Sequence, residues 1–427
     1  MSGTVDAEDA ESLLQRLAGS PQRIELGLER MRAAMQRLGI PENLPFPVIT
    51  VAGTNGKGSV LAYLEALYQQ SAYRCAAYSS PHIWRFAERL RVAGEPLPDR
   101  CWREKFAPLA SLAEEIPLTY FELSTLAALL LCLDEAPDLA ILEVGLGGRL
   151  DAVNAIDADI AIISSIDLDH QALLGPDRES IGREKAGILR PGRPVLYGDR
   201  ESPCASVLTA AEQRAAPLWL LGRDFDLDAS GRWQAGATST SAPPPMLDSA
   251  AQRANLALAL AAVYQLRARL PQAWPPQERW RFTPRLLGRS QWLQPWGEDG
   301  PRLLVDVAHN PQAVRALADT LAGQSGRIFA CWGMMADKDL AASVAPLRAK
   351  VDAWALLEMP DNPRAASPAQ LREQLADEDI CCELSLIDLP EHLRRWAAEL
   401  GSDDILLCFG SFHVLSALPS EWFGYAP

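Results

Sequence analysis

Several features that would indicate other classes of protein are missing from this sequence. Its eight cysteines are scattered and include no CxxC pair, so the chain carries neither a disulfide framework nor a cysteine zinc site. The longest apolar run, residues 125–133, is too short to cross a bilayer. The acidic, polar first eleven residues do not resemble a signal peptide. We therefore expect a cytoplasmic protein with no membrane partner.

Positive charge is also scarce. The 40 lysines and arginines are outnumbered by 55 aspartates and glutamates, a net charge of 40 − 55 = −15, which argues against nucleic acid as a general partner. Anionic small substrates remain compatible if local cations, backbone N–H groups or a metal bind them. The hydrophobic content, 48% of 427 residues, allows large cores and two or three domains. We expect a monomer.

Short apolar runs alternate with segments of helical period, which is typical of an α/β fold with a mainly parallel sheet. Strands are predicted to begin at Pro47, Asp138 and Asp159, and a helix is predicted over Lys57–Gln70. Continuous apolar runs of this kind suit strands that helices cover on both faces.

The stretch 224–249 is rich in Gly, Ser, Thr and Pro and has little periodicity. We predict turns and a surface excursion there, followed by a helix over Ala250–Leu270. A second α/β series begins near residue 289, with strands in RLLVDVAHN, RIFACWG, VDAWALLEM and DDILLCFGS. The boundary between two domains is therefore predicted between about residues 282 and 302.

The run GTNGKGS, residues 53–59, lies between a predicted strand and a predicted helix. Its glycines let backbone N–H groups approach phosphate, the helix N-terminus adds partial positive charge, and Lys57 can reach the β and γ phosphates. The run departs from G-x-x-x-x-G-K-[ST], because Val51 replaces the first glycine and the hydroxyl moves to Ser59. A tight turn with a solvated lysine is the competing interpretation. We favour nucleotide binding, which by itself does not separate kinase, ligase and hydrolase.

Nine blocks resemble the folylpolyglutamate synthase family and follow its order across nearly the whole chain. They are GTNGKGS, SSPHIWRFAERLRVAGE, TYFE, LEVGLGGRLDAVN, SSIDLDHQALLG, EKAGI, DVAHNPQA, GMMADKD and GSFHV. The resemblance implies an α/β protein with a mainly parallel-sheet P-loop ATPase domain, similar to the central domain of Mur ligases and including a pterin site, over residues 1–287. A smaller Rossmann-like domain is implied over 288–427.

The resemblance also implies an activity: ATP-dependent addition of L-glutamate to dihydropteroate and to reduced folates through an acyl phosphate. Such chemistry needs charge neutralisation and placement more than a nucleophilic side chain, and the sequence contains no G-x-S-x-G elbow. The TYFE and GRLDA runs favour the bifunctional form. The alternatives are folylpolyglutamate synthase activity alone, a Mur-type amino-acid ligase, and a nucleotide-binding regulator without catalysis. The Mur interpretation is weak because only 52 residues precede Gly53.

One or two Mg²⁺ ions are implied, with ATP as co-substrate. Glu143 ends a predicted buried strand, where a carboxylate needs a partner such as a metal. A pair between Glu143 and Arg149 is the alternative. By resemblance the ligands near the γ-phosphate are Ser80, Glu143 and His170, and Asp167 and Asp169 are competing carboxylates.

Lys185 lies in a predicted helix that follows His170 and can return toward the metal. A neutral lysine amine can add CO₂ and become a carbamate, a hard oxygen ligand that suits Mg²⁺. The resemblance points the same way, so we predict a carbamylated Lys185 that supports a second metal. An unmodified lysine bound to a phosphate or to Glu184 is the alternative.

The resemblance assigns the remaining substrate contacts. ATP is assigned to Thr54, Asn55, Gly56, Lys57, Gly58, Ser59, Asn255, Arg289 and Asp306, and the pterin to Thr119, Phe121, Glu122, Asp151 and Ala152. Core packing is the competing interpretation of Phe121. Catalytic roles fall to Lys57, Glu143, His170 and Lys185.

Incoming glutamate is assigned to Arg89, His309 and Ser411. Arg89 is physically the strongest of these, because a guanidinium binds a carboxylate through two parallel hydrogen bonds. A surface salt bridge with Glu88 or Glu95 is the alternative. The sequence departs from the family at Ala87, where Asn is frequent, and at LLGRSQ, where LPGR-type sequences are usual.

Overall fold

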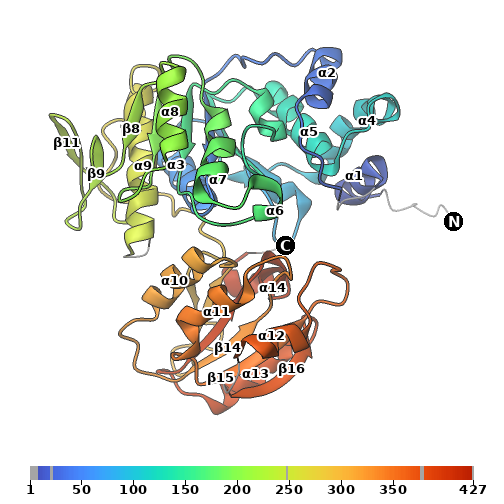
Figure 1. Ribbon diagram of the computed structural model, residues 1–427, viewed down its shortest axis with the longest axis vertical. Helices are drawn as coiled ribbons and strands as arrows, with labels where there is room; N and C mark the ends of the chain where they lie inside the picture. Colours follow the sequence, from blue (N-terminus) through green and yellow to red (C-terminus); the bar gives the residue numbers. More distant parts are fainter. Residues whose placement is uncertain (1–7, 20–22, 247–248, 376–378, 426–427) are drawn as a thin grey trace. The chain divides into compact units, whose positions relative to one another are not determined.

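The computed structural model describes residues 8–19, 23–246, 249–375 and 379–425, and the chain divides into two compact units (Figure 1). Unit 1 comprises Met1–Asp167 and Leu174–Arg285, and unit 2 comprises Leu168–Leu173 and Leu286–Pro427. The division at residue 285 lies close to the predicted 287. The sequence did not indicate that residues 168–173 group with unit 2.

The main sheet of unit 1 is mostly parallel. Its strands are β1 Val48–Ala52, β2 Cys75–Tyr78, β3 Leu90–Val92, β4 Glu95–Pro96, β5 Leu139–Glu143, β6 Ile160–Ile163, β7 Val195–Tyr197 and β8 Leu218–Leu220. Their order within the described residues is β4-β3-β2-β5-β1-β6-β7-β8. The six strands β2, β5, β1, β6, β7 and β8 run parallel to one another. β3 and β4 add an antiparallel edge next to β2.

Helices cover both faces of this sheet, as the apolar strands require. The helical segments of unit 1, with α6 reaching into it from residue 171, are α1 Ala10–Ala18, α2 Glu29–Leu38, α3 Lys57–Gln69, η1 Phe86–Arg89, α4 Asp99–Glu115, α5 Tyr120–Glu135, η2 Ala152–Ala155, α6 Gln171–Leu174, α7 Arg178–Lys185, η3 Ala186–Ile188, α8 Ala205–Gln213, α9 Ala250–Leu266 and η4 Pro271–Ala273.

Successive residues of β1 point to opposite faces of the sheet. Val48 belongs to a hydrophobic cluster shared with α1, α2, α4 and α5, and Ala52 to a second cluster shared with α7 and α8. On the opposite face α3 and α9 pack together against the central strands. The carboxyl ends of β1, β5 and β6 therefore lie at one edge of a fully covered sheet, where open α/β folds bind ligands.

The stretch 224–249 contains a small antiparallel sheet, so the prediction of turns alone was wrong. The strands are β9 Phe225–Leu227, β10 Arg232–Ala235 and β11 Thr238–Ser241, in the order β11-β10-β9. Trp233 of β10 is buried, donates a hydrogen bond to the Ala257 carbonyl of α9 at 3.2 Å and packs 5.1 Å from Trp274. Strands of three or four residues show too few alternations to be recognised in a polar stretch. The helix that follows ends at Leu266, before the predicted Leu270.

Unit 2 is built on a second sheet. Its strands are β12 Gln291–Leu293, β13 Arg302–Asp306, β14 Ile328–Trp332, β15 Ala353–Glu358, β16 Ile380–Ser385 and β17 Ile405–Phe409. In the described ranges their order is β12-β13-β17-β14-β15-β16, all parallel except β12. The four central strands were predicted. The two edge strands were not, because their half-exposed residues form no apolar run.

The helical segments of unit 2 lie on both faces of this sheet. They are α10 Pro311–Thr320, α11 Leu340–Arg348, α12 Pro368–Leu375, α13 Leu389–Glu399, α14 Phe412–Ser416 and η5 Ser420–Phe423. α10, α11 and α12 share a core with Trp332 and Phe409, and α13 packs Trp396 on Phe329 of β14 at 5.4 Å. The predicted α/β fold is confirmed.

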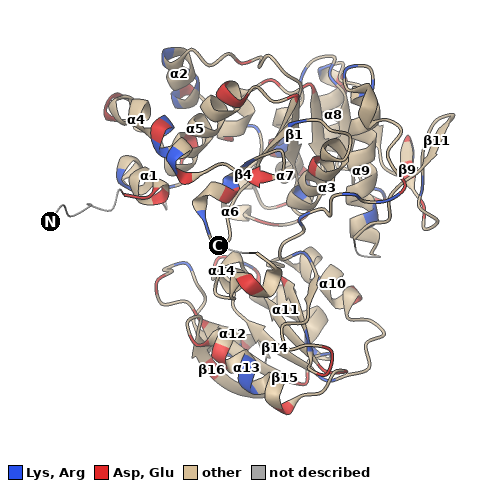
Figure 2. Cartoon of the chain, turned by 180° about the vertical axis from the view of Figure 1, so that it is seen from behind, with Lys and Arg blue, Asp and Glu red and all other residues tan. Residues whose placement is uncertain are grey.

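Acidic and basic residues are interspersed along the helices of both units in the view of Figure 2. No described helix is both long enough and apolar enough to span a bilayer.

Candidate active site

The phosphate loop joins the end of β1 to the first turn of α3. Gly56 has a φ of +86°, and a Cβ there would lie 2.5 Å from Oδ1 of Asn255. A Cβ on Gly53 would lie 1.9 Å from Oγ of Ser164. The backbone therefore demands glycine at both positions. Lys57 begins α3 and donates from Nζ to the Gly53 carbonyl at 3.0 Å, so its ammonium lies over the loop beside the helix N-terminus.

The loop after β6 fixes this phosphate loop. The Thr54 N–H donates to the Ser165 carbonyl at 2.7 Å, and Thr54 Oγ1 donates to the Asp167 carbonyl at 3.0 Å. The Asn55 N–H donates to Oγ of Ser165 at 3.2 Å. Thr54 and Asn55 are thus held by the loop after β6, and Asp167 contributes its backbone carbonyl to this contact.

Helix α9 supplies the other wall of the phosphate loop. Asn255 lies against Gly56, and one turn earlier Gln252 donates from Nε2 to Oγ of Ser59 at 3.4 Å. Ser59 is 1% exposed and Gln252 is 7% exposed. The structure therefore brings Gly56, Ser59 and Asn255 together, as their predicted role requires. Gln252 was missed, although its place three residues before Asn255 puts it on the same helix face.

Glu143 ends β5 next to β1, with Val51 as its register partner, and is 4% exposed. The alternative that it pairs with Arg149 is wrong, because Arg149 pairs with Glu184 at 2.9 Å. Lys185, the last residue of α7, is 3% exposed. Glu143 is therefore a buried ionisable group at the edge of the sheet that carries the phosphate loop. The backbone of Lys185 lies beside the glycine turn after β5, where a Cβ on Gly148 would lie 3.0 Å from the Lys185 Cα.

The predicted metal ligands are divided between the units. Ser80, Glu143 and Lys185 lie in unit 1, whereas His170 belongs to the segment grouped with unit 2. Among the described residues no three His, Cys, Asp or Glu side chains are arranged to hold a metal. Only Glu143 and His170 of the predicted set are of these types. The hydroxyl and carboxylate oxygens of Ser80 and Glu143 are hard donors, and their chemistry fits Mg²⁺.

Asp169 is the centre of an ionic cluster in unit 2. Its carboxylate pairs with Lys338, and these side chains are 7% and 6% exposed. The other groups around the carboxylate include the His170 N–H at 2.8 Å, Nε2 of His309 at 3.4 Å and Nδ2 of Asn310 at 3.4 Å. Burial alone would raise the pKa of Asp169, but the hydrogen bond from His309 and the charge of Lys338 outweigh it and hold the pKa well below its usual range. The resemblance left Asp169 without a role. The structure shows that this residue, which directly precedes His170, is held in unit 2 by its ion pair with Lys338.

The nucleotide residues predicted in unit 2 meet at the end of β13. Asp306 accepts hydrogen bonds from the Ser290 N–H at 2.6 Å and from the Ala308 N–H at 2.7 Å. The Arg289 guanidinium lies 5.3 Å from the centre of the Phe412 ring. Asp306 and Arg289 are therefore held near one another by the strand end and the loop before β12.

Two predicted pterin residues begin α5. Thr119 and Glu122 form a capping box, in which the Glu122 N–H donates to Oγ1 of Thr119 at 3.2 Å and the Thr119 N–H donates to Oε2 of Glu122 at 2.8 Å. Glu122 also pairs with Arg30 at 3.2 Å. Their side chains thus fix the start of the helix that carries Phe121.

Phe121 and Asp151 lie around the glycine turn after β5. A Cβ on Gly145 would lie 2.7 Å from the Phe121 ring, which is partly buried against the first cluster. Asp151 accepts hydrogen bonds from the N–H groups of Leu146 at 2.8 Å and Val153 at 3.0 Å. It caps η2, whose first residue, Ala152, is buried.

We expect Asp151 to titrate near neutrality. Burial raises its pKa to about 7, against the opposing effect of the backbone N–H groups of Leu146 and Val153. The folded state then binds this proton more tightly than the unfolded chain, whose carboxyl has a pKa of about 3.9. The bound proton therefore stabilises the folded state fully below about pH 4, and this stabilisation is lost as the pH rises to about 7. The loss in the free energy of unfolding is roughly 4 kcal/mol.

The measurement is the free energy of unfolding against pH for the wild type and Asp151→Asn. The variant should lack this part of the slope between about pH 4 and 7. Parallel curves would contradict the prediction, whatever their vertical offset.

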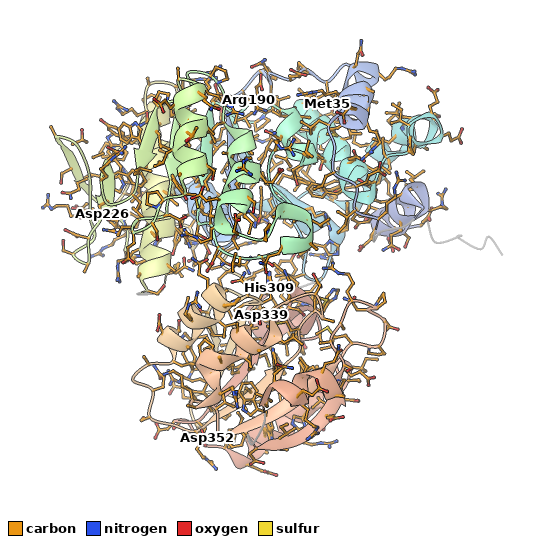
Figure 3. All side chains as sticks on the ribbon, viewed as in Figure 1. Met35, Arg190, Asp226, His309, Asp339 and Asp352 are labelled. Atoms are coloured by element: carbon orange, nitrogen blue, oxygen red, sulfur yellow. The ribbon has the colours of Figure 1, made fainter. Side chains whose placement is uncertain are left out.

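The predicted glutamate residues lie in both units. His309, labelled in Figure 3, donates from Nδ1 to the Val307 carbonyl at 2.7 Å. Ser411 caps α14 by accepting from the Val414 N–H at 3.3 Å. Arg89, at the end of η1, is 7% exposed and donates from Nε to Nδ1 of His82 at 3.0 Å.

The alternative of a surface salt bridge for Arg89 is wrong. Glu88 instead accepts from the N–H groups of Ile83 at 2.8 Å and Arg85 at 2.9 Å, and Glu95 lies 3.7 Å from Arg285. Within the described residues, no carboxylate lies within ion-pair distance of Arg89. A buried guanidinium of this kind is a ready partner for a substrate carboxylate.

Comparisons with known proteins identify the family. Residues 288–412 match the family model of the Mur ligase, glutamate ligase domain. The dihydrofolate synthase/folylpolyglutamate synthase of Escherichia coli is 39% identical over 400 residues, covering 92% of this chain and 90% of the relative. The protein of that description from Haemophilus influenzae is 33% identical and covers 92% of each chain. The chain belongs to the dihydrofolate synthase/folylpolyglutamate synthase family.

A solved structure supports this family's fold for the whole chain. E. coli FolC in complex with DHPP and ADP has a TM-score of 0.85 at 36% identity and covers 96% of both chains. The predictions of the family, of the α/β fold and of an ATP-dependent folate ligase are therefore confirmed. The family departure at Ala87 lies in η1, where the side chain packs on the first hydrophobic cluster two positions before Arg89.

Proposed function

We propose that this chain is a cytoplasmic, monomeric ligase that joins glutamate to dihydropteroate and also extends reduced folates, with ATP and Mg²⁺. The phosphate loop alone does not separate this activity from that of a kinase or a hydrolase. The buried Arg89, which has no carboxylate partner among the described residues, favours a substrate that brings its own carboxylate. A bifunctional relative has been solved with Mn, AMPPNP and L-glutamate bound, which supports a divalent metal, an adenine nucleotide and glutamate as three of the components that the proposal requires.

Different residues bind the phosphates, the metal, the pterin and the glutamate. Lys57 and the N–H groups at the start of α3 bind the ATP phosphates, and Arg89 orients the carboxylate of the incoming glutamate. Ser80, Glu143, His170 and Lys185 would hold Mg²⁺, which neutralises phosphate charge when bound. Thr119, Phe121 and Asp151 surround the pterin. His309 and Ser411 complete the glutamate contacts, and Arg289 and Asp306 the nucleotide contacts.

The experiment is glutamate-dependent phosphate release, measured with dihydropteroate and with tetrahydrofolate in separate reactions. Release with both acceptors supports the bifunctional enzyme. Release with tetrahydrofolate alone indicates folylpolyglutamate synthase activity only. ATP binding with no release on addition of glutamate overturns the proposal in favour of a regulator.

We further propose that Lys185 is carbamylated. The residue is 3% exposed, and burial disfavours a charged ammonium and makes the neutral amine accessible to CO₂. A carbamate oxygen would suit Mg²⁺ better than an ammonium. The carboxylate of Glu184, the competing partner, is occupied by Arg149.

Protein incubated with ¹³C-bicarbonate should show a carbamate carbon signal that is absent from Lys185→Ala. That variant should lose catalysis while its ATP affinity stays within a few-fold of the wild type. A spectrum without the carbamate signal under saturating bicarbonate and Mg²⁺ would refute the modification.

A further inference from the structure

The buried Arg89 is held by His82, and the geometry fixes the tautomer of that histidine. Nε of an arginine can only donate a hydrogen bond. Nδ1 of His82, 3.0 Å away, is therefore the acceptor and carries no proton. The proton of a neutral His82 then lies on Nε2, which faces Oε2 of Glu11 at 3.4 Å. The hydrogen bonds run in one direction, from Arg89 to His82 to Glu11.

Glu11 is itself held in place from two sides. It lies in the first turn of α1, and its Oε1 accepts a hydrogen bond from the Tyr120 hydroxyl at 3.1 Å. The hydrogen bond from His82 lowers the pKa of Glu11 against the effect of burial. Helix α1 is anchored in turn by a hydrogen bond from the Ala10 N–H to Asp99 at 3.0 Å. The carboxylate is therefore ionised and fixed at neutral pH.

Two aromatic rings lie beside the guanidinium of Arg89. Its Cζ is 5.3 Å from the centre of the Phe86 ring and 5.2 Å from that of the Tyr120 ring. Phe86 is fixed by Trp102, whose ring centre is 4.7 Å away. With Nε engaged by His82, only the two terminal nitrogens of Arg89 remain, and within the described residues they donate to no protein group.

This arrangement has a steric consequence. A carboxylate can bind a guanidinium side-on, through Nε and one terminal nitrogen, or end-on, through both terminal nitrogens. His82 blocks the side-on mode. Because the imidazole stands between them, Glu11 fixes the guanidinium without occupying its terminal nitrogens.

We propose that Glu11 and His82 are positioning residues that orient Arg89 for end-on binding of a carboxylate of the incoming glutamate. The inference rests on the proposed function of Arg89 and adds which residues orient its guanidinium. It assigns a role to helix α1 in the recognition of an amino-acid substrate.

The test uses three changes in the full chain. His82→Leu removes the acceptor for Nε of Arg89, and His82→Asn restores an acceptor oxygen near the position of Nδ1. Glu11→Ala removes the partner of Nε2. We expect His82→Leu to raise the KM for glutamate about tenfold, as the loss of one charge-assisted hydrogen bond implies. The kcat at saturating glutamate and the KM for ATP should stay within about twofold, and His82→Asn should recover most of the loss.

A spectroscopic measurement tests the geometry without activity. In ¹⁵N-histidine-labelled protein, Nδ1 of His82 should give the chemical shift of an unprotonated nitrogen. Glu11→Ala should leave Nδ1 of His82 unprotonated, because Arg89 still donates to it, and should raise the KM for glutamate because the imidazole loses its anchor. A protonated Nδ1 in the wild type overturns the inference, as does an unchanged KM for glutamate in both His82→Leu and Glu11→Ala.

Failure of the inference and failure of the proposed function give different results. If Arg89→Ala raises the KM for glutamate and the other variants do not, only the positioning role is wrong. If Arg89→Ala leaves that KM unchanged, the role of Arg89 itself is wrong and the inference falls with it. If the wild type releases no phosphate with glutamate, the ligase activity is wrong.

Discussion

Lys57→Ala should reduce ligation by roughly 10²–10³-fold, the effect of removing one preorganised charge from a phosphoryl-transfer site. The Lys57 ammonium lies over the phosphate loop, 3.0 Å from the Gly53 carbonyl, and no core depends on it. The fold should therefore survive. The measurement is kcat/KM for glutamate-dependent phosphate release, together with the thermal unfolding midpoint.

Lys350→Ala is the matched control, because Lys350 is an exposed lysine in unit 2. It should leave both the rate and the unfolding midpoint unchanged. Near-wild-type turnover by Lys57→Ala would contradict the assignment of the loop to the ATP phosphates. A large fall in the unfolding midpoint would show instead that Lys57 supports the fold.

Lys338→Met should destabilise unit 2 by about 3–5 kcal/mol, the usual effect of removing one partner from a buried ion pair. Lys338 and Asp169 are 6% and 7% exposed, so water cannot replace the lost ammonium. His309 and Asn310 still contact the carboxylate of Asp169, so we expect a loss near the lower end of this range. We also expect lower ligase activity, because Asp169 precedes the predicted metal ligand His170.

The double variant Asp169→Asn/Lys338→Met separates charge from packing. Because it removes both charges, its unfolding free energy should recover part of the loss, as in a double-mutant cycle between coupled sites. Urea unfolding followed by tryptophan fluorescence measures the change for the whole chain, because buried tryptophans lie in both units, Trp102 and Trp233 in unit 1 and Trp332 and Trp354 in unit 2. Equal stability of Lys338→Met and the wild type would show that the ion pair contributes nothing.

The parts of the fold that the sequence predicted are those in which local pattern and environment agree. The central strands β1, β5, β6, β13, β14, β15 and β17 are buried on both faces, and each forms a continuous apolar run. The edge strands β12 and β16 and the small sheet around Trp233 were missed, because partial exposure leaves no such run. The glycines at 53 and 56 were predicted as part of a phosphate loop, and the structure adds the contacts with Ser164 and Asn255 that require them.

The sequence by itself determined the class of site: a phosphate loop at the end of a strand, a buried acidic residue near a neighbouring strand end, and an arginine suited to a carboxylate. It could not determine the partners of the charged residues. Arg149 pairs with Glu184 rather than Glu143, and Asp169 pairs with Lys338, 169 positions away. Arg89 meets His82 and, through it, Glu11 of the first helix. Such pairings follow from the order of strands in each sheet and the packing of helices on it, so only the tertiary structure decided them.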